Sequence, residues 1–136
     1  MEIKKIANLI KEKGGRLYLV GGAVRDELLN RSVSDDDYCV VGLDKKEFLE
    51  LFPNSFSRGK SFEVFELNRS EFALARKEIK IGEGHKAFEI ITGKDITIEE
   101  DLERRDITIN SIAQDVLTGE IIDPYKRYRR YKKWDN

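Results

Sequence analysis

The chain has 136 residues, of which 40% are hydrophobic and 38% are charged, and its formal net charge is −1. This length favours one domain with a modest apolar core, and the near-neutral charge argues neither for nor against a nucleic-acid partner. The single cysteine excludes an internal disulfide, no apolar run reaches the roughly 18 residues of a membrane span, and no signal peptide is evident, so we expect a cytoplasmic protein without a membrane partner.

Helical and strand patterns alternate along the chain. In chain order the predicted elements are a helix at 2–13, a strand at 16–20, a helix at 23–30, a strand at 38–41, a helix at 45–51, strands at 62–67 and 88–91, a charged helix at 97–105 and a hairpin at 111–122. Residues 71–80 are ambiguous, because their composition suits a helix and their alternation suits a strand. This mixture predicts an α+β fold.

Two glycines and an arginine follow the first predicted strand. Gly21 and Gly22 lie where that strand would meet a helix, and glycine there lets an anion approach the N–H groups of a helix N-terminus. Arg25, on the first turn of the same helix, could bind a phosphate in a bidentate manner. The alternatives are a plain tight turn and a surface ion pair of Arg25 with Asp26 or Glu27.

Three consecutive aspartates precede the second predicted strand. Because alternate side chains of a strand share a face, Asp35 and Asp37 would point one way and Asp36 the other. Such a pair could bind Mg²⁺, which prefers carboxylate, phosphate and water oxygens. A solvated acidic loop is the alternative. The glycines and Arg25 a few residues upstream favour a metal–nucleotide site that activates a hydroxyl for attack.

Two further sets of residues are candidates. Glu78 could add a third carboxylate if 72–78 forms a strand beside 38–41, and a surface acid is the alternative. Arg105 and Asn110 could reach one cleft if the charged helix continues that far. Arg105 would then hold a triphosphate, and Asn110 a ribose hydroxyl or a base edge. A solvated helix end is the alternative.

These residues belong to an ordered series of motifs. GGAVRD, DDD, ARKE, RRDITIN and a final DP follow one another within about residues 16–125. In this order they resemble the head domain of class II tRNA nucleotidyltransferases, the CCA-adding enzymes, which bacterial poly(A) polymerases share within the polymerase-beta-like nucleotidyltransferases. The resemblance implies a catalytic head domain over residues 1–125, with a small mixed sheet and helices packed on it.

The resemblance also implies a role for each motif. Asp35 and Asp37 match the catalytic D-x-D carboxylates that bind two Mg²⁺ ions, and Glu78 matches the acid of A-R-x-E, a further catalytic position. The positions that match nucleotide-binding residues are Gly21, Gly22, Arg25, Arg105, Asp106 and Asn110. The implied reaction transfers a nucleotide from CTP or ATP to an RNA 3′ hydroxyl, foremost the 3′ CCA end of tRNA, and releases pyrophosphate.

Residues 126–136 depart from the family pattern. They combine six cations with aromatic residues, and they could bind RNA or form a solvated end. The family's neck, body and tail domains have no expected counterpart here, so the chain could be a fragment, a minimal enzyme, or one of two chains. The alternative functions are a nucleotidyltransferase that modifies another RNA, a protein or a small molecule, and a non-catalytic module that binds NTP or RNA.

Overall fold

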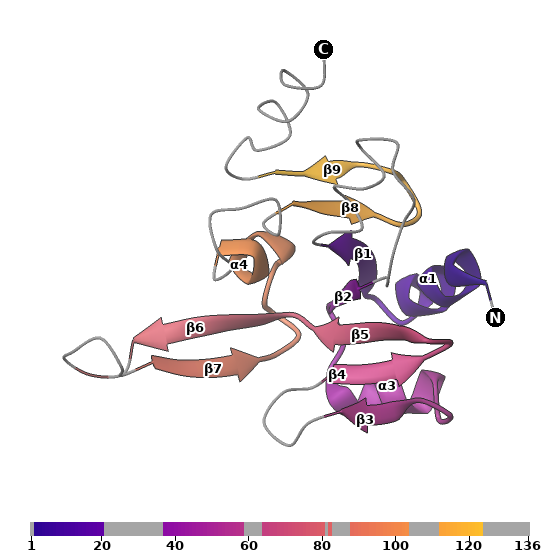
Figure 1. Cartoon of the computed structure of the whole chain (residues 1–136), viewed down its shortest axis with the longest axis horizontal. Coiled ribbons are helices and arrows are strands. Elements are labelled where there is room, and N and C mark those ends of the chain that lie inside the picture. Colours follow the sequence, from indigo (N-terminus) through magenta and orange to yellow (C-terminus); the bar gives the residue numbers. More distant parts are fainter. Residues whose placement is uncertain are drawn as a thin grey trace, which may run out of the picture.

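The computed structural model packs short helices on a mixed β-sheet and adds a second, two-stranded sheet (Figure 1). It describes residues 2–20, 37–58, 64–80, 82, 88–103 and 112–123. The elements are α1 (Ile3–Glu12), β1 (Arg16–Val20), β2 (Asp37–Val41), α3 (Lys45–Leu51), β3 (Phe56–Arg58), β4 (Val64–Leu67), β5 (Ser70–Leu74), β6 (Arg76–Lys80), β7 (Phe88–Thr92), α4 (Ile98–Glu103), β8 (Ala113–Asp115) and β9 (Ile121–Ile122). The predicted α+β fold with a mixed sheet is confirmed.

The main sheet has seven strands in the order β3-β4-β5-β2-β1-β8-β9. Strands β2 and β5 run parallel, and the other neighbouring pairs of this sheet are antiparallel. Strands β6 and β7 form the separate antiparallel sheet, which extends to the left of the main sheet in Figure 1. Strand β2 therefore lies inside the main sheet, between β1 and β5.

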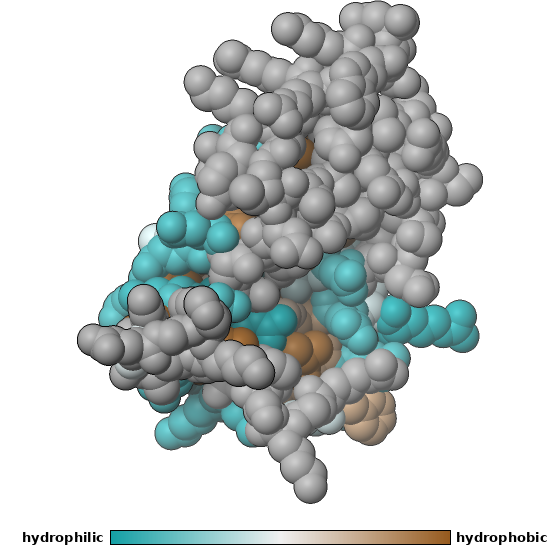
Figure 2. Space-filling model, turned by 60° about the vertical axis from the view of Figure 1, so that its left-hand side comes forward, coloured by the Kyte–Doolittle hydropathy of each residue, from teal (hydrophilic) through white to brown (hydrophobic). Residues whose placement is uncertain are grey.

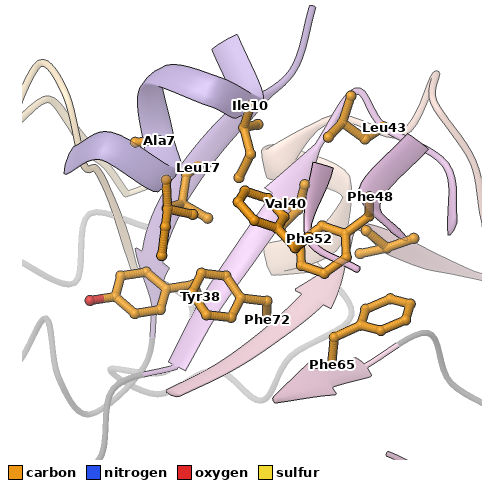
Figure 3. Packing of buried hydrophobic residues seen from close by; sticks show 12 residues of the cluster. Ala7, Ile10, Leu17, Tyr38, Val40, Leu43, Phe48, Phe52, Phe65 and Phe72 are labelled. Atoms are coloured by element: carbon orange, nitrogen blue, oxygen red, sulfur yellow. The ribbon is translucent and has the colours of Figure 1, made fainter. Parts of the chain in front are cut away.

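Both faces of β2 are buried, which explains why its sequence is continuously apolar. Tyr38 and Val40 belong to one core cluster with residues of α1 and α3, whereas Cys39 belongs to a second cluster with residues of α4. In the first cluster the rings of Tyr38 and Phe72 stack with centroids 5.0 Å apart, and Phe48 stacks on Phe65 at 4.7 Å (Figure 3). The main sheet is thus covered on both sides, by α1 and α3 on one face and by α4 on the other.

Two helices begin with reciprocal capping hydrogen bonds. Asp44 accepts from the backbone N–H of Glu47 at 2.8 Å, and Glu47 accepts from that of Asp44 at 3.2 Å. Thr97 Oγ1 accepts from the N–H of Glu100 at 3.1 Å, and Glu100 accepts from the N–H of Thr97 at 3.0 Å. These contacts satisfy N–H groups that have no partner inside the helix. The predicted starts of α3 and α4 are therefore confirmed.

The ambiguous segment 71–80 is two strands rather than one element. Strand β5 pairs with β2 and β4, and β6 pairs with β7. The chain changes sheets at Ala75, which is 2% exposed. Strand β3 was not predicted from the sequence. On β4, Phe65 takes the inner position and is fully buried.

The described residues visible in one view of the surface are mostly polar. In Figure 2, turned so that the β6–β7 end of Figure 1 comes forward, hydrophilic colours predominate around small hydrophobic areas. Among the described residues, the exposed large hydrophobic side chains are Phe56, Ile79 and Ile90. None of the helices in the described part of the chain is both long and apolar enough to span a bilayer.

Candidate nucleotide and metal site

Asp37 is the first residue of β2 and is exposed at the end of that strand. It lies opposite Val20 on the antiparallel neighbour β1 and opposite Glu71 on the parallel neighbour β5. Glu71 in turn lies opposite Glu66 of β4. Residues in register on neighbouring strands point to the same face. Three carboxylates therefore project from one face of the sheet, in adjacent positions.

The face on which Asp37 projects follows from the alternation along β2. Tyr38 points into the core cluster beneath α1 and α3, and Cys39 points into the cluster beneath α4. Since Asp37 lies two residues from Cys39 on the strand, its side chain belongs to the α4 side of the sheet. Val20, its partner on β1, is buried in the same cluster as Leu102 of α4.

The register of Asp37 continues as one row across all seven strands of the main sheet. In sheet order the row is Phe56, Glu66, Glu71, Asp37, Val20, Ala113 and Ile122. We call it the register row.

Four sequence motifs adjoin the register row along the chain. Val20 directly precedes Gly21, and Asp37 is itself the last of the three aspartates. Ala113, the first residue of β8, lies three residues after Asn110, and Ile122 directly precedes the Asp-Pro motif. The fold thus brings the chain segments next to these motifs to one end of the sheet, although they lie up to about a hundred residues apart in the sequence.

Glu78 does not lie in the register row. It is on β6, opposite Ile90 of β7, in the two-stranded sheet. The strand expected beside β2 extends only from Ser70 to Leu74, so it ends before Glu78 is reached. A catalytic role for Glu78 stays a prediction.

Glu71 is the carboxylate that sequence reasoning missed. The available signal was the Asn68-Arg69 pair, both residues of which have positive φ, at 52° and 66°, and form the tight turn of the β4–β5 hairpin. Asparagine is typical of such turns. That turn would have predicted a strand beginning at Ser70. The parallel pairing that brings Glu71 beside Asp37 has no local signal.

The remaining sequence-predicted site residues lie outside the described residues. They are Gly21, Gly22, Arg25, Asp35, Arg105, Asp106 and Asn110, together with the basic tail at 126–136. Within the described part of the chain, no three His, Cys, Asp or Glu residues are grouped so that they could hold a metal ion. The carboxylates of the register row would therefore need further ligands to form a metal centre.

Asp115 fixes the β8–β9 hairpin beside β1. Its Oδ1 accepts from the backbone N–H groups of Leu117 and Thr118 at 2.9 and 3.0 Å, and its Oδ2 accepts from Arg16 at 3.0 Å. Burial alone would raise the pKa of the Asp115 carboxyl, but the bonds from Thr118, Leu117 and Arg16 outweigh it and lower that pKa. This carboxylate holds β8, and with it Ala113 of the register row, against β1.

Comparison of this sequence with known protein families and proteins gives consistent matches. The sequence profile of the poly(A) polymerase head domain matches residues 17–133. The chain is 51% identical over 113 residues to a CCA-adding enzyme of Buchnera aphidicola, an alignment that covers 82% of this chain and 27% of that protein. It is 46% identical over 112 residues to a multifunctional CCA protein of Nitrosospira multiformis, covering 81% of this chain and 26% of the relative.

Solved structures with a similar fold include a CCA-adding enzyme and a tRNA nucleotidyltransferase. A Bacillus stearothermophilus CCA-adding enzyme in complex with CTP superposes with a TM-score of 0.70 at 28% identity, over 94% of this chain and 30% of that one. A tRNA nucleotidyltransferase complexed with a primer tRNA and an incoming ATP analogue gives a TM-score of 0.66 at 32% identity, over 93% and 36%. The chain therefore spans about a quarter to a third of the length of these relatives.

Proposed function

This chain belongs to the poly(A) polymerase head domain family, and on that premise we propose that it transfers a nucleotide from CTP or ATP to an RNA 3′ hydroxyl and releases pyrophosphate. The acceptor we propose is the 3′ CCA end of tRNA, since the relatives are named for CCA addition. The observation that carries the proposal is the register row, which adjoins the GG, DDD, RRDITIN and DP motifs at one end of the sheet.

Two Mg²⁺ ions fit the donor set that we assign to Asp35 and Asp37. Asp37 presents an exposed carboxylate at the start of a strand, and the adjacent Glu71 adds a second acid in register with it. Carboxylate oxygens are the ligands that Mg²⁺ prefers, alongside phosphate and water. When bound, the metal would lower the pKa of the acceptor hydroxyl and neutralise charge on the leaving pyrophosphate.

The other residues of the proposed site hold the nucleotide. The side chains of Arg25 and Arg105 and the backbone N–H groups of Gly21 and Gly22 bind the triphosphate and keep it in line with the attacking hydroxyl. Asp106 and Asn110 contact the sugar and base of the nucleotide. We propose these roles from the family motifs, and the register row supports them because its residues Val20 and Ala113 lie close in the sequence to two of those motifs.

The proposed domain organisation is a catalytic head at residues 1–125 followed by the basic segment 126–136, which we propose contacts RNA. Selection between CTP and ATP and binding of the tRNA body would use further domains, in the same polypeptide or in a second chain. We also propose a cytoplasmic location, which suits a chain whose single cysteine, Cys39, is buried in the sheet and forms no disulfide.

The test is nucleotide incorporation by the purified chain with Mg²⁺, labelled CTP or ATP, and tRNA that lacks its 3′ CCA. Asp37→Ala, alone and with Asp35→Ala, should abolish labelled product. Glu50→Ala is the matched control, because Glu50 is an acid of α3 that contacts Lys13 and lies outside the register row. Activity retained in the double variant would refute the metal site. Label found in protein or in a small molecule instead of tRNA would refute the proposed acceptor.

A further inference from the structure

Besides Asp115, a second buried carboxylate among the described residues, that of Asp101, contacts the first residue of β6. Asp101 of α4 is 1% exposed, and one of its carboxylate oxygens, Oδ1, accepts a hydrogen bond from the backbone N–H of Arg76 at 3.0 Å. Burying a carboxylate costs free energy unless it is well bonded. An acid in the first turn suits the positive end of the helix dipole, but that does not account for the burial of this side chain, which therefore needs a further explanation.

The N–H that Asp101 accepts belongs to the junction between the two sheets. The N–H of Ala75 donates to the carbonyl of Val40 at 2.8 Å and extends the pairing of β5 with β2. The next N–H, that of Arg76, donates to Asp101, and β6 begins at that residue. Asp101 thus marks the point at which the chain leaves the strand that carries Glu71.

The helix that carries Asp101 is fixed on the face of the sheet where Asp37 projects. Ile98 and Leu102 are buried in the same core cluster as Val20 and Cys39. Glu100 adds a contact to Lys77 of β6 at 3.3 Å. Helix α4 ends at Glu103, and the RRDITIN motif follows directly in the sequence.

We propose that Asp101 is a positioning residue for the nucleotide. Its hydrogen bond joins Arg76, the first residue of β6 and two residues beyond the end of β5, to the helix that precedes Arg105 in the sequence. Asp37, which is in register with β5, and Arg105 could then hold one nucleotide. This inference rests on the proposed function. A purely structural role would lower the melting temperature and leave the affinity of the folded protein for nucleotide unchanged, which makes the two roles separable.

The experiment measures the Kd of the full chain for CTP in the presence of Mg²⁺ by equilibrium dialysis, at a temperature at which circular dichroism shows every variant to be folded. Asp101→Ala should raise the Kd by up to about tenfold, because the coupling of this bond to nucleotide binding cannot exceed the free energy of one hydrogen bond to a charged group. Asp101→Asn keeps an Oδ1 that accepts the Arg76 N–H, and its Kd should stay closer to that of the wild type.

Glu100→Ala is the matched control on the same helix. It removes the contact to Lys77 and the bond from the N–H of Thr97, and leaves the carboxylate of Asp101 in place. It should lower stability without changing the Kd. If Asp101→Ala does not fold, Asp101→Glu replaces it, because the added methylene displaces the oxygen from Arg76, and the same rise in Kd is expected.

The outcomes separate the two proposals. A wild-type chain that binds neither CTP nor ATP with Mg²⁺ would overturn the proposed function. A wild-type chain that binds nucleotide, with an Asp101→Ala variant of equal affinity, would overturn only the positioning role. Equal losses in the Glu100→Ala and Asp101→Ala variants would also overturn it, since the effect would then belong to α4 as a whole.

Discussion

Replacing Asp115 by alanine tests how the β8–β9 hairpin is held against the sheet. The Asp115 carboxylate is 5% exposed and accepts from the backbone N–H groups of Leu117 and Thr118 and from the Arg16 guanidinium. Alanine removes all of these acceptors at once. The two N–H groups of the turn then regain only those hydrogen bonds that solvent can supply.

The expected loss in the free energy of unfolding is about 3 kcal/mol. Each hydrogen bond from a turn N–H contributes about 1 kcal/mol to the free energy of unfolding. The value is no higher because Thr118 lies at the surface, where water can partly replace the lost bond. The pair with Arg16 adds about 0.5–1 kcal/mol, since the Arg16 side chain is 54% exposed and solvent screens it. Asp115→Asn retains a neutral oxygen for both N–H groups and should lose only about 1 kcal/mol.

Urea unfolding followed by circular dichroism measures this difference, and a thermal scan should show a melting temperature lower by about 10 °C for the alanine variant. The difference also depends on pH. Because the folded-state pKa of Asp115 is lowered, its contribution is complete above the unfolded value of about 3.9 and is lost as the pH falls through the folded pKa. Wild type and Asp115→Asn should therefore approach each other in acid.

Two results would refute this reasoning. If Asp115→Ala lost less than about 0.5 kcal/mol, the buried bonds would not support the hairpin, because that is the range of ordinary surface substitutions. If Asp115→Asn and Asp115→Ala were equally unstable at neutral pH, the oxygen that accepts from the turn would not matter and only the charge would.

Two further predictions concern the core. Gly15→Ala would place a Cβ 2.7 Å from the Val41 carbonyl oxygen and should lower the free energy of unfolding in urea by about 1–3 kcal/mol. Its control, Gly93→Ala, would place a Cβ with no neighbouring atom within 4 Å and should be near neutral. Equal effects of the two substitutions would contradict the close approach of Gly15 to Val41. Phe48→Ala removes a fully buried ring that packs against Phe52, Phe65 and Phe72 and should cost about 3–5 kcal/mol. Its control, Phe56→Ala, removes a ring that is 71% exposed, and a similar loss there would contradict the assigned core.

Much of the fold could be predicted from local sequence. The spacing of apolar residues predicts α1 and α3, the short apolar runs predict β1 and β2, and the hairpin pattern at 111–122 predicts the pairing of β8 with β9, all of which the structure contains. These elements depend on periodicity, capping and turn residues within a few positions of each other. The order of the motifs likewise predicted the family, which the sequence comparison confirms.

The division of 71–80 into two strands could not be predicted in this way. The first strand ends at Leu74, and at the start of the second the N–H of Arg76 donates to Asp101, which lies 25 residues away in the sequence. The partner of Asp37 was missed for the same kind of reason. Glu71 reaches it through a parallel pairing across a long connection, and such pairings leave no trace in short-range spacing.

The place of β1 in the sheet has a consequence for synthesis of the chain on the ribosome. Strand β1 is made early, yet its second neighbour, β8, is made nearly a hundred residues later. Until then the apolar segment LYLV forms an unprotected edge of the growing sheet, and such edges pair with other chains. Translation that stalls after β5 and before β8 should therefore yield aggregation-prone nascent chains, and this interval is where a holding chaperone would be needed.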